Sequence, residues 1–281
     1  MSTYNQLIHK YKKQFELKGL SPEMVKAFIL ELCNEEKVNL YYDIDKQALP
    51  SIEDKFEKGI IRMLNDEPMN YVLGYSYFYG YQFKVNKDVL IPRPETEELV
   101  GLILSKYDEF YKGQNVNICD VGTGSGAIAI SLKKEEEKLN VFASDISIDA
   151  LNVAKENADN LNANIQFLCG SMLEPYIENN IKVDILVSNP PYIRNDEKLE
   201  ASVIDYEPHV ALFGGDDGLK FYKEIFTLSN KVLNENGLIF FEMGYDQAEN
   251  MSKLAHSYYP NGKVEIYKDI NGKDRMFLLK L

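Results

Sequence analysis

One tetrapeptide, Asn189-Pro190-Pro191-Tyr192, combines residue types that can hold and aim a planar NH2 group. It directly follows the apolar run 183–187, which is typical of a buried strand. Each proline fixes its φ angle and lacks an N–H donor, and the residue before a proline is pushed toward extended backbone. The strand must therefore end in a rigid shelf, at the carboxyl edge of a sheet where open α/β folds bind ligands.

The shelf suits one chemical task, the methylation of an NH2 group on an sp2 carbon, as in glutamine, adenine or cytosine. Such a nitrogen is a weak nucleophile because its lone pair is delocalised. We predict that the Asn189 side-chain carbonyl and the Pro190 main-chain carbonyl accept its N–H bonds. The Tyr192 ring is expected to pack on the flat target. Asn189, Pro190 and Tyr192 are thus the predicted catalytic residues, and Pro191 joins them in binding the substrate. Alignment in a dry pocket can be worth about 7–11 kcal/mol. No dedicated general base is required, because the methylated nitrogen is acidic once it forms and can lose its proton through the acceptor network.

A glycine-rich turn at residues 120–127 predicts a nucleoside site. It lies between an apolar strand and a helical stretch, and its glycines let a ligand approach the backbone. Asp145 follows the next strand at roughly the 20-residue spacing expected for an acid that binds ribose hydroxyls. The predicted donor-binding residues are Gly122, Thr123, Gly124, Ser125, Gly126 and Asp145.

The glycines alone do not separate two kinds of nucleoside ligand. Gly122, Gly124 and Ala127 also satisfy the G-x-G-x-x-A pattern of dinucleotide sites. Asp120 favours S-adenosylmethionine, because a carboxylate just before the turn repels a pyrophosphate. S-adenosylmethionine has no phosphate and presents a cationic ammonium and sulfonium. The two motifs together predict a methyltransferase that uses this donor.

The elements that carry the motifs alternate between strand and helix. Apolar runs separated by helical stretches occur at residues 116–119, 141–143, 165–168, 185–187 and 238–241. This alternation predicts an α/β fold with a mostly parallel, Rossmann-like sheet covered by helices on both faces. Two further runs, 264–267 and 276–279, flank Asn271-Gly272 and predict a C-terminal antiparallel hairpin.

The amino-terminal part has a different pattern. Residues 1–70 show apolar side chains at helical spacing and predict a small helical-bundle domain. Residues 71–92 are rich in tyrosine and are punctuated by Gly74 and Gly80, which is typical of a β-hairpin connector. The catalytic domain is then expected to span residues 93–281.

Composition limits the expected partners. The net charge of −13 over 281 residues, with no basic stripe, disfavours direct nucleic-acid binding, because phosphates must be neutralised. No apolar stretch is long enough to cross a bilayer and no signal peptide is evident, so we expect a cytoplasmic protein without membrane contact. Three scattered cysteines and three isolated histidines predict no metal site. We expect a monomer.

The chain resembles the release factor glutamine methyltransferases, which modify the glutamine of the Gly-Gly-Gln motif in class I peptide chain release factors. The resemblance runs from about Pro68 to the C-terminus and is most specific at residues 90–97, Leu-Ile-Pro-Arg-Pro-Glu-Thr-Glu. The other matching positions are 71–74, 120–126, Asp145, 189–192, 207–208, 211–215, Glu242, Gly244, Gln247, Gly272 and Arg275.

This resemblance implies a class I S-adenosylmethionine-dependent methyltransferase fold, with an N-terminal domain that helps to recognise the release factor. It implies that Asn189 contacts both donor and target, and that residues 93–97 line the donor pocket. The sequence departs from the family at Gly170-Ser171-Met172, where members often carry an acid followed by an aromatic residue. We expect Ser171 to hydrogen-bond the adenine of the donor and Met172 to cover its face.

Two other functions stay open on sequence grounds. A nucleic-acid adenine N6 methyltransferase shares the tetrapeptide, because adenine N6 presents the same planar NH2 group. The acidic charge and residues 91–97 disfavour it, and a duplex substrate also requires base flipping. A non-catalytic scaffold of the same fold is disfavoured because Asn189 and the glycines are all present. We therefore expect methyl transfer to the side-chain N5 of a release-factor glutamine.

Overall fold

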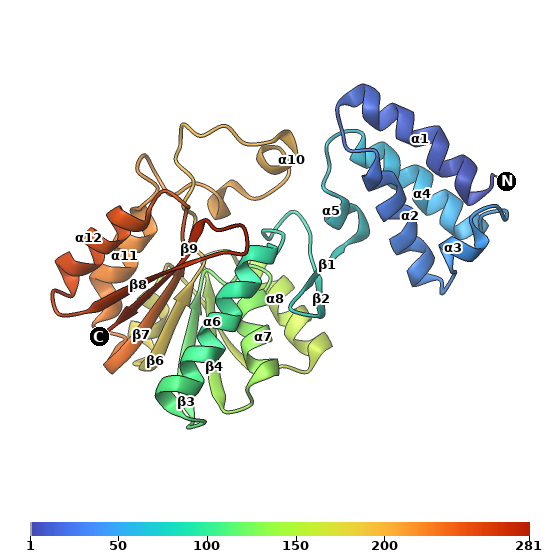
Figure 1. The fold of residues 1–281 in the computed structure, drawn as a ribbon. Helices are drawn as coiled ribbons and strands as arrows, with labels where there is room; N and C mark the ends of the chain where they lie inside the picture. Colours follow the sequence, from blue (N-terminus) through green and yellow to red (C-terminus); the bar gives the residue numbers. More distant parts are fainter. Residues whose placement is uncertain (1) are drawn as a thin grey trace. The chain divides into compact units, whose positions relative to one another are not determined.

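The computed structural model describes residues 2–281, which fall into two compact units. One contains the chain up to Gly74 together with Glu200–Tyr206, and the other contains Tyr75–Leu199 and Glu207–Leu281. Within residues 71–92, β1 (Tyr75–Phe78) and β2 (Tyr81–Lys84) form an antiparallel hairpin, which belongs to the second unit (Figure 1).

The first unit is a helical bundle. In its core, Phe28 and Phe56 stack with ring centroids 5.8 Å apart. A Cβ at Gly59 would lie 2.2 Å from the Phe28 ring, so this glycine allows the close approach of two helices. A short segment from far along the sequence completes the unit, and there the Tyr206 hydroxyl donates to the Asn65 carbonyl. The helices are α1 (Tyr4–Lys18), α2 (Glu23–Glu35), α3 (Leu40–Asp43), α4 (Pro50–Met63), α5 (Met69–Leu73) and α10 (Ala201–Ile204).

The second unit is built around a seven-stranded sheet with the order β5-β4-β3-β6-β7-β9-β8. β3 to β7 run parallel, whereas β9 is antiparallel to both β7 and β8. The predicted parallel sheet with a C-terminal antiparallel hairpin is therefore confirmed. The strands are β3 (Val116–Val121), β4 (Leu139–Asp145), β5 (Ile165–Cys169), β6 (Val183–Ser188), β7 (Leu233–Glu242), β8 (Lys263–Lys268) and β9 (Asp274–Lys280).

Helices cover both faces of this sheet, because alternate strand residues are buried on opposite sides. Ile185 and Phe240 pack into one apolar cluster with residues of α6 to α8, and their neighbours Leu186 and Phe241 pack into another with residues of α9, α11 and α12 (Figure 1). The helices are α6 (Pro94–Tyr111), α7 (Ala127–Glu135), α8 (Ile148–Leu161), α9 (Glu174–Glu178), α11 (Lys220–Ser229) and α12 (Ala248–Tyr258), with a 3-10 turn η1 (His209–Ala211).

The strand order reverses between β3 and β6. The chain moves outward from β3 through β4 to β5, then returns to place β6 on the other side of β3. Loops that leave the carboxyl ends of these strands diverge at such a reversal and leave a crevice where ligands bind. The glycine turn, Asp145 and Asn189 follow or end β3, β4 and β6, so all three meet at this edge.

We predict that Phe241→Ala destabilises the second unit. Phe241 is fully buried, and its ring centroid lies 5.1 Å from that of Tyr222 and 5.4 Å from that of Phe226. Truncation leaves a cavity, so the free energy of unfolding should fall by about 3–5 kcal/mol, measured by chemical denaturation and circular dichroism. Ile270→Ala is the control: its side chain is 89% exposed. That change should cost less than about 0.5 kcal/mol, and equal losses would contradict this packing.

Candidate active site

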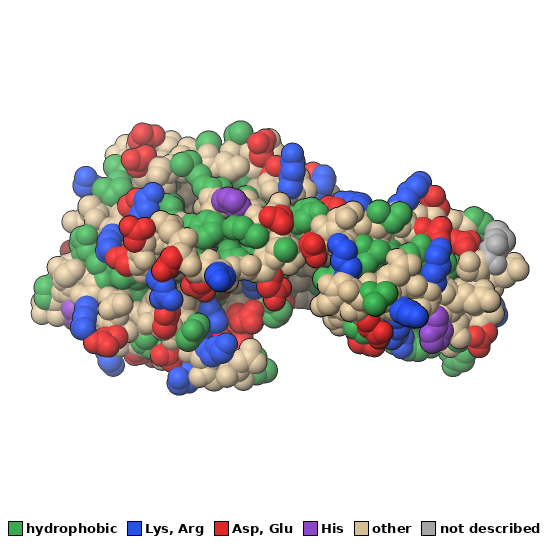
Figure 2. Space-filling view, turned by 90° about the horizontal axis from the view of Figure 1, so that it is seen from above, with side chains coloured by type: hydrophobic (Ala, Val, Ile, Leu, Met, Phe, Trp, Pro, Cys, Tyr) green, Lys and Arg blue, Asp and Glu red, His purple; other side chains and the backbone are tan. Residues whose placement is uncertain are grey.

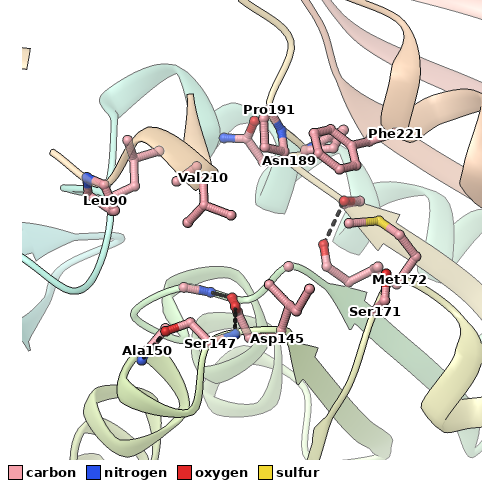
Figure 3. Close-up of a pocket in the computed structure, with 18 of the residues that line it drawn as sticks. Leu90, Asp145, Ser147, Ala150, Ser171, Met172, Asn189, Pro191, Val210 and Phe221 are labelled. Carbon is pink, nitrogen blue, oxygen red and sulfur yellow. Dashed lines mark hydrogen bonds between the residues drawn. The ribbon is translucent and has the colours of Figure 1, made fainter. Parts of the chain in front are cut away.

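A cavity of about 350 Å³ opens at the carboxyl ends of β3, β4 and β6 (Figure 3). Its size falls in the range of small-molecule sites, and its surface is mainly apolar with a few polar groups, as such sites are. The lining residues are Asp88, Val89, Leu90, Val121, Gly122, Gly124, Asp145, Ile146, Ser147, Ala150, Gly170, Ser171, Met172, Ser188, Asn189, Pro190, Pro191, Pro208, Val210, Ala211, Lys220, Phe221 and Glu224.

Two glycines of the predicted turn, Gly122 and Gly124, form part of the cavity wall. Their φ angles are 75° and 55°, a left-handed conformation that side chains disfavour. A Cβ built at either position meets no atom within 4 Å, so the space beside the backbone is open. This open backbone fits a ligand that approaches the turn closely.

The other three residues of the turn lie behind the wall and shape it. The Thr123 hydroxyl donates to Asp120 Oδ2 at 2.6 Å, and the Ser125 carbonyl accepts from Asn157 Nδ2 at 2.9 Å. Gly126 begins α7 with a φ of 83°. Thr123, Ser125 and Gly126 do not line the cavity, so they support the turn, and direct contact with the donor stays a prediction.

Asp145 joins the turn to the end of β4 and faces the cavity (Figure 3). Its Oδ2 accepts the Gly124 N–H and its Oδ1 accepts the Ser147 N–H, each at 2.9 Å. Burial raises the pKa of Asp145, and these backbone hydrogen bonds oppose that shift. Each carboxylate oxygen keeps a further acceptor site, so the pair can bind the two hydroxyls of a ribose.

Asp120 is fully buried and does not line the cavity. Burial raises the pKa of its carboxyl group to about 7, against the hydrogen bond from Thr123. Asp120 therefore supports the turn through Thr123 and forms no part of the cavity wall. Its preference for a cationic ligand over a pyrophosphate stays a prediction.

The tetrapeptide supplies the opposite wall. Asn189, Pro190 and Pro191 line the cavity, and Figure 3 shows Asn189 and Pro191 across from Asp145 and Ser147. Tyr192 does not line it: the residue packs against the apolar cluster that contains Leu186 and Phe241. Burial raises the pKa of the Tyr192 hydroxyl far above its ordinary value. Stacking of this ring on the target stays a prediction.

Two glycines and a glutamine brace the tetrapeptide from outside. A Cβ at Gly214 would lie 2.5 Å from the Pro191 carbonyl, and one at Gly218 would lie 2.4 Å from the Tyr192 carbonyl. Gln247 Nε2 donates to that same Tyr192 carbonyl at 3.1 Å. The family-like run 211–215 and Gln247 therefore keep the shelf rigid.

Residues 93–97 are not among those that line this cavity, so their contact with the donor stays a prediction. Pro94 starts α6, and the first turn of this helix buries Thr96 in the protein. Arg93 pairs with Glu207 at 2.5 Å, and the Thr96 hydroxyl donates to Glu242 at 2.5 Å. These residues brace the site from behind.

Glu242, at the end of β7, is a buried acid beside the tetrapeptide. Burial raises its pKa, and the hydrogen bonds from Thr96 and Tyr192 and the charge of Arg275 oppose that shift. The sequence marked Glu242 and Arg275 only as positions of family resemblance, and it assigned no contact to either.

Sequence reasoning also missed the apolar part of the wall. Leu90, Val210 and Phe221 come from a loop, from η1 and from the start of α11. Leu90 begins the family-like run 90–97, which could have indicated it. Val210 and Phe221 belong to no sequence motif that could have indicated them. Ser171 and Met172, predicted beside the adenine, both line the cavity.

Residues 2–281 contain no cluster of three His, Cys, Asp or Glu side chains arranged to hold a metal ion. None of their helices is both long enough and apolar enough to span a bilayer.

Comparisons with known proteins agree with this geometry. Residues 102–206 match the family model of the methyltransferase small domain. The curated release factor glutamine methyltransferase of Bacillus cereus is 39% identical over 255 residues, which covers 89% of this chain and 90% of the relative. That of Bacillus subtilis is 44% identical over 224 residues, covering 79% and 78%.

A solved methyltransferase from Pyrococcus furiosus superimposes with a TM-score of 0.52 at 16% identity, covering 78% of this chain and 96% of that one. This likeness concerns the fold alone. Together with the sheet order it confirms the predicted class I methyltransferase fold, and S-adenosylmethionine is accordingly the cofactor.

We predict that Asp145→Ala weakens donor binding. The change removes two charged acceptors from the cavity and releases the Gly124 N–H. Charge-assisted hydrogen bonds are worth about 1.5–3 kcal/mol, so the Kd for S-adenosylmethionine should rise roughly 10- to 100-fold by titration calorimetry. Asp159→Ala removes an exposed carboxylate from α8 and should leave the Kd unchanged. An unaltered Kd in Asp145→Ala would remove Asp145 from the donor site.

Proposed function

The chain belongs to the release factor glutamine methyltransferase family, and we propose that it methylates the side-chain N5 of the glutamine in the Gly-Gly-Gln motif of class I peptide chain release factors. One observation carries the proposal. Asn189 and Pro190 line the same cavity as Asp145 and two glycines of the turn. A nitrogen-holding shelf and a nucleoside site thus share one enclosed space.

The cavity residues fit the donor. Gly122 and Gly124 leave open space beside the backbone, Asp145 can bind ribose hydroxyls, and Ser171 with Met172 can contact the adenine. When bound, S-adenosylmethionine supplies a methyl group on a positively charged sulfur, which is already activated for transfer. The chain itself has therefore to position the acceptor nitrogen and to exclude water.

Asn189 and Pro190 perform the positioning. The Asn189 side-chain oxygen and the Pro190 carbonyl accept the two N–H bonds of the glutamine amide, which fixes the nitrogen in one orientation. Held in this way, the nitrogen would be aimed at the methyl group that the donor supplies, and it would lose one proton on methylation. The two oxygens that hold the N–H bonds are placed to accept that proton.

Water is excluded by the apolar wall. Leu90, Val210 and Phe221 line the cavity around the Asn189 side, and a low-dielectric surrounding strengthens the hydrogen bonds that hold the amide. Near-attack alignment of this kind can supply about 7–11 kcal/mol of the barrier reduction.

The proposed partner also bears on where the protein acts. A release factor is a protein substrate, so a net charge of −13 is no obstacle to binding it. We place the reaction in the cytoplasm, where translation ends, and keep a monomer as the working oligomeric state.

Incubation with labelled S-adenosylmethionine tests the substrate. A class I release factor, its Gly-Gly-Gln to Gly-Gly-Ala variant and bulk nucleic acid are the three acceptors, and mass spectrometry locates the methyl group. We expect methylation of the wild-type glutamine and of neither other acceptor. Methyl groups on nucleic acid would support an adenine N6 activity in its place.

We predict that Asn189→Ala nearly abolishes turnover. Loss of one positioned acceptor should lower kcat by about 100- to 1,000-fold, because the amide nitrogen is no longer aimed. The Kd for S-adenosylmethionine should change little, because Gly122, Gly124 and Asp145 remain. Asn160→Ala, an exposed site on α8, is the matched control. Turnover at the wild-type rate in Asn189→Ala would reject this mechanism.

A further inference from the structure

We propose that Glu242 and Thr96 are positioning residues that fix which way round the Asn189 amide sits, so that its oxygen and not its NH2 group faces the target. The inference rests on the proposed function for the identity of that target. It is carried by a chain of four hydrogen bonds that ends at Asn189.

The chain begins at Arg275 and, with Glu242 ionised, has only one consistent direction. Arginine carries donors alone, so Arg275 Nη1, 3.4 Å from the Tyr192 hydroxyl, makes that oxygen an acceptor. The single hydroxyl proton of Tyr192 then goes to Glu242 Oε1 at 3.1 Å. Burial raises the pKa of Glu242, and the hydrogen bond from Thr96, the positive charge of Arg275 and the hydrogen bond from Tyr192 oppose that shift. In its ionised form Glu242 accepts at both oxygens and does not donate.

The second half of the chain follows from this direction. Glu242 Oε2 accepts the Thr96 hydroxyl proton at 2.5 Å. Because its only proton is donated to Glu242, Thr96 Oγ1 can only accept a hydrogen bond from Asn189. It therefore accepts from Asn189 Nδ2, which lies 3.3 Å away. A flipped amide would set two acceptor oxygens against each other without a proton between them.

The orientation of the Asn189 amide matters for the reaction, because its oxygen accepts hydrogen bonds whereas its NH2 group donates them. With Nδ2 bound to Thr96, Asn189 Oδ1 remains as the end of the amide that can accept from a target in the cavity, which Asn189 lines. An NH2 target needs an acceptor there. The flipped amide would present N–H groups to N–H groups and would repel the glutamine.

The same carboxylate controls both ends of the tetrapeptide. One oxygen of Glu242 holds Tyr192 directly, and the other holds Asn189 through Thr96. Glu242 is 2% exposed and Thr96 is 5% exposed, so water does not compete strongly for these bonds. Neither residue lines the cavity, so each acts through the tetrapeptide.

Thr96→Val is the first test, because it removes the hydroxyl and keeps the shape. With the release factor as substrate, kcat should fall about 10- to 100-fold, as loss of an orienting partner typically does. KM for the release factor and Kd for S-adenosylmethionine should stay within about twofold, because no contact to either ligand is removed. Thr96→Ser retains the hydroxyl and should recover most of the lost rate.

Thr227→Val is the matched control. It makes the same change on α11, where the hydroxyl bonds the Lys223 carbonyl and the Tyr258 hydroxyl, and it should leave kcat unchanged. A merely structural role for Thr96 would instead lower the melting temperature and weaken donor binding together with kcat.

Glu242→Gln tests the hydrogen bond between Glu242 and Thr96, and it decides whether these residues orient Asn189 if Thr96→Val does not fold. Its Nε2 can donate to Thr96 Oγ1, which frees the Thr96 proton for Asn189 and allows the flipped amide. We expect kcat to fall while the Kd for S-adenosylmethionine is retained. Wild-type kcat in either Thr96→Val or Glu242→Gln would overturn the proposal, as would a Thr96→Ser variant as slow as Thr96→Val.

Failure of the proposed function is recognised separately. If the wild-type protein leaves the release-factor glutamine unmodified, the substrate is wrong. The amide orientation is then decided by a crystal structure at better than about 1.2 Å, where hydrogens and the two amide ends are distinguishable. Nδ2 toward Thr96 supports the inference, and Oδ1 toward Thr96 overturns it.

Discussion

The reversal of strand order between β3 and β6 is the constraint on which both halves of the site depend. Parallel strands bring their carboxyl ends to one edge, and the reversal leaves a crevice there that no helix fills. The predicted donor-binding glycines and Asp145 lie at the ends of β3 and β4, and the tetrapeptide predicted to hold the acceptor follows β6. Because adjacent strands are held in register by backbone hydrogen bonds, the distance between the two halves is set by the sheet and not by flexible loops.

A network of buried polar side chains around Glu242 lies behind this edge. A buried carboxylate is costly unless its charge is opposed and its oxygens are hydrogen-bonded, and Glu242 has both kinds of compensation. Such a satisfied polar network has few alternative arrangements, so it specifies one geometry where an apolar core would tolerate several. The rigid prolines fix the backbone of the shelf, and the network fixes its side chains.

The sequence predicted the sheet well and the buried polar network around Glu242 poorly, for physical reasons. Strands buried on both faces read as short apolar runs, and prolines and glycines mark turns locally, so the tetrapeptide and the glycine turn were visible. Thr96 and Glu242 lie 146 residues apart, and nothing local indicates that they meet. The Tyr192 ring packs against an apolar cluster whose members come from strands and helices far apart in the sequence, and no local pattern indicates that packing. α10 is too short to show helical periodicity.

The membership of Glu200–Tyr206 in the first unit limits how modular the protein is. The chain leaves the second unit soon after the shelf, contributes α10 to the helical bundle, and re-enters at Glu207, which receives hydrogen bonds from Ile91 and Arg93. A fragment that ends at Gly74 would therefore lack one segment of the helical bundle, Glu200–Tyr206. Deleting that fragment would leave α10 without its packing partners, and exchanging the helical bundle between relatives would require two segments to be exchanged together.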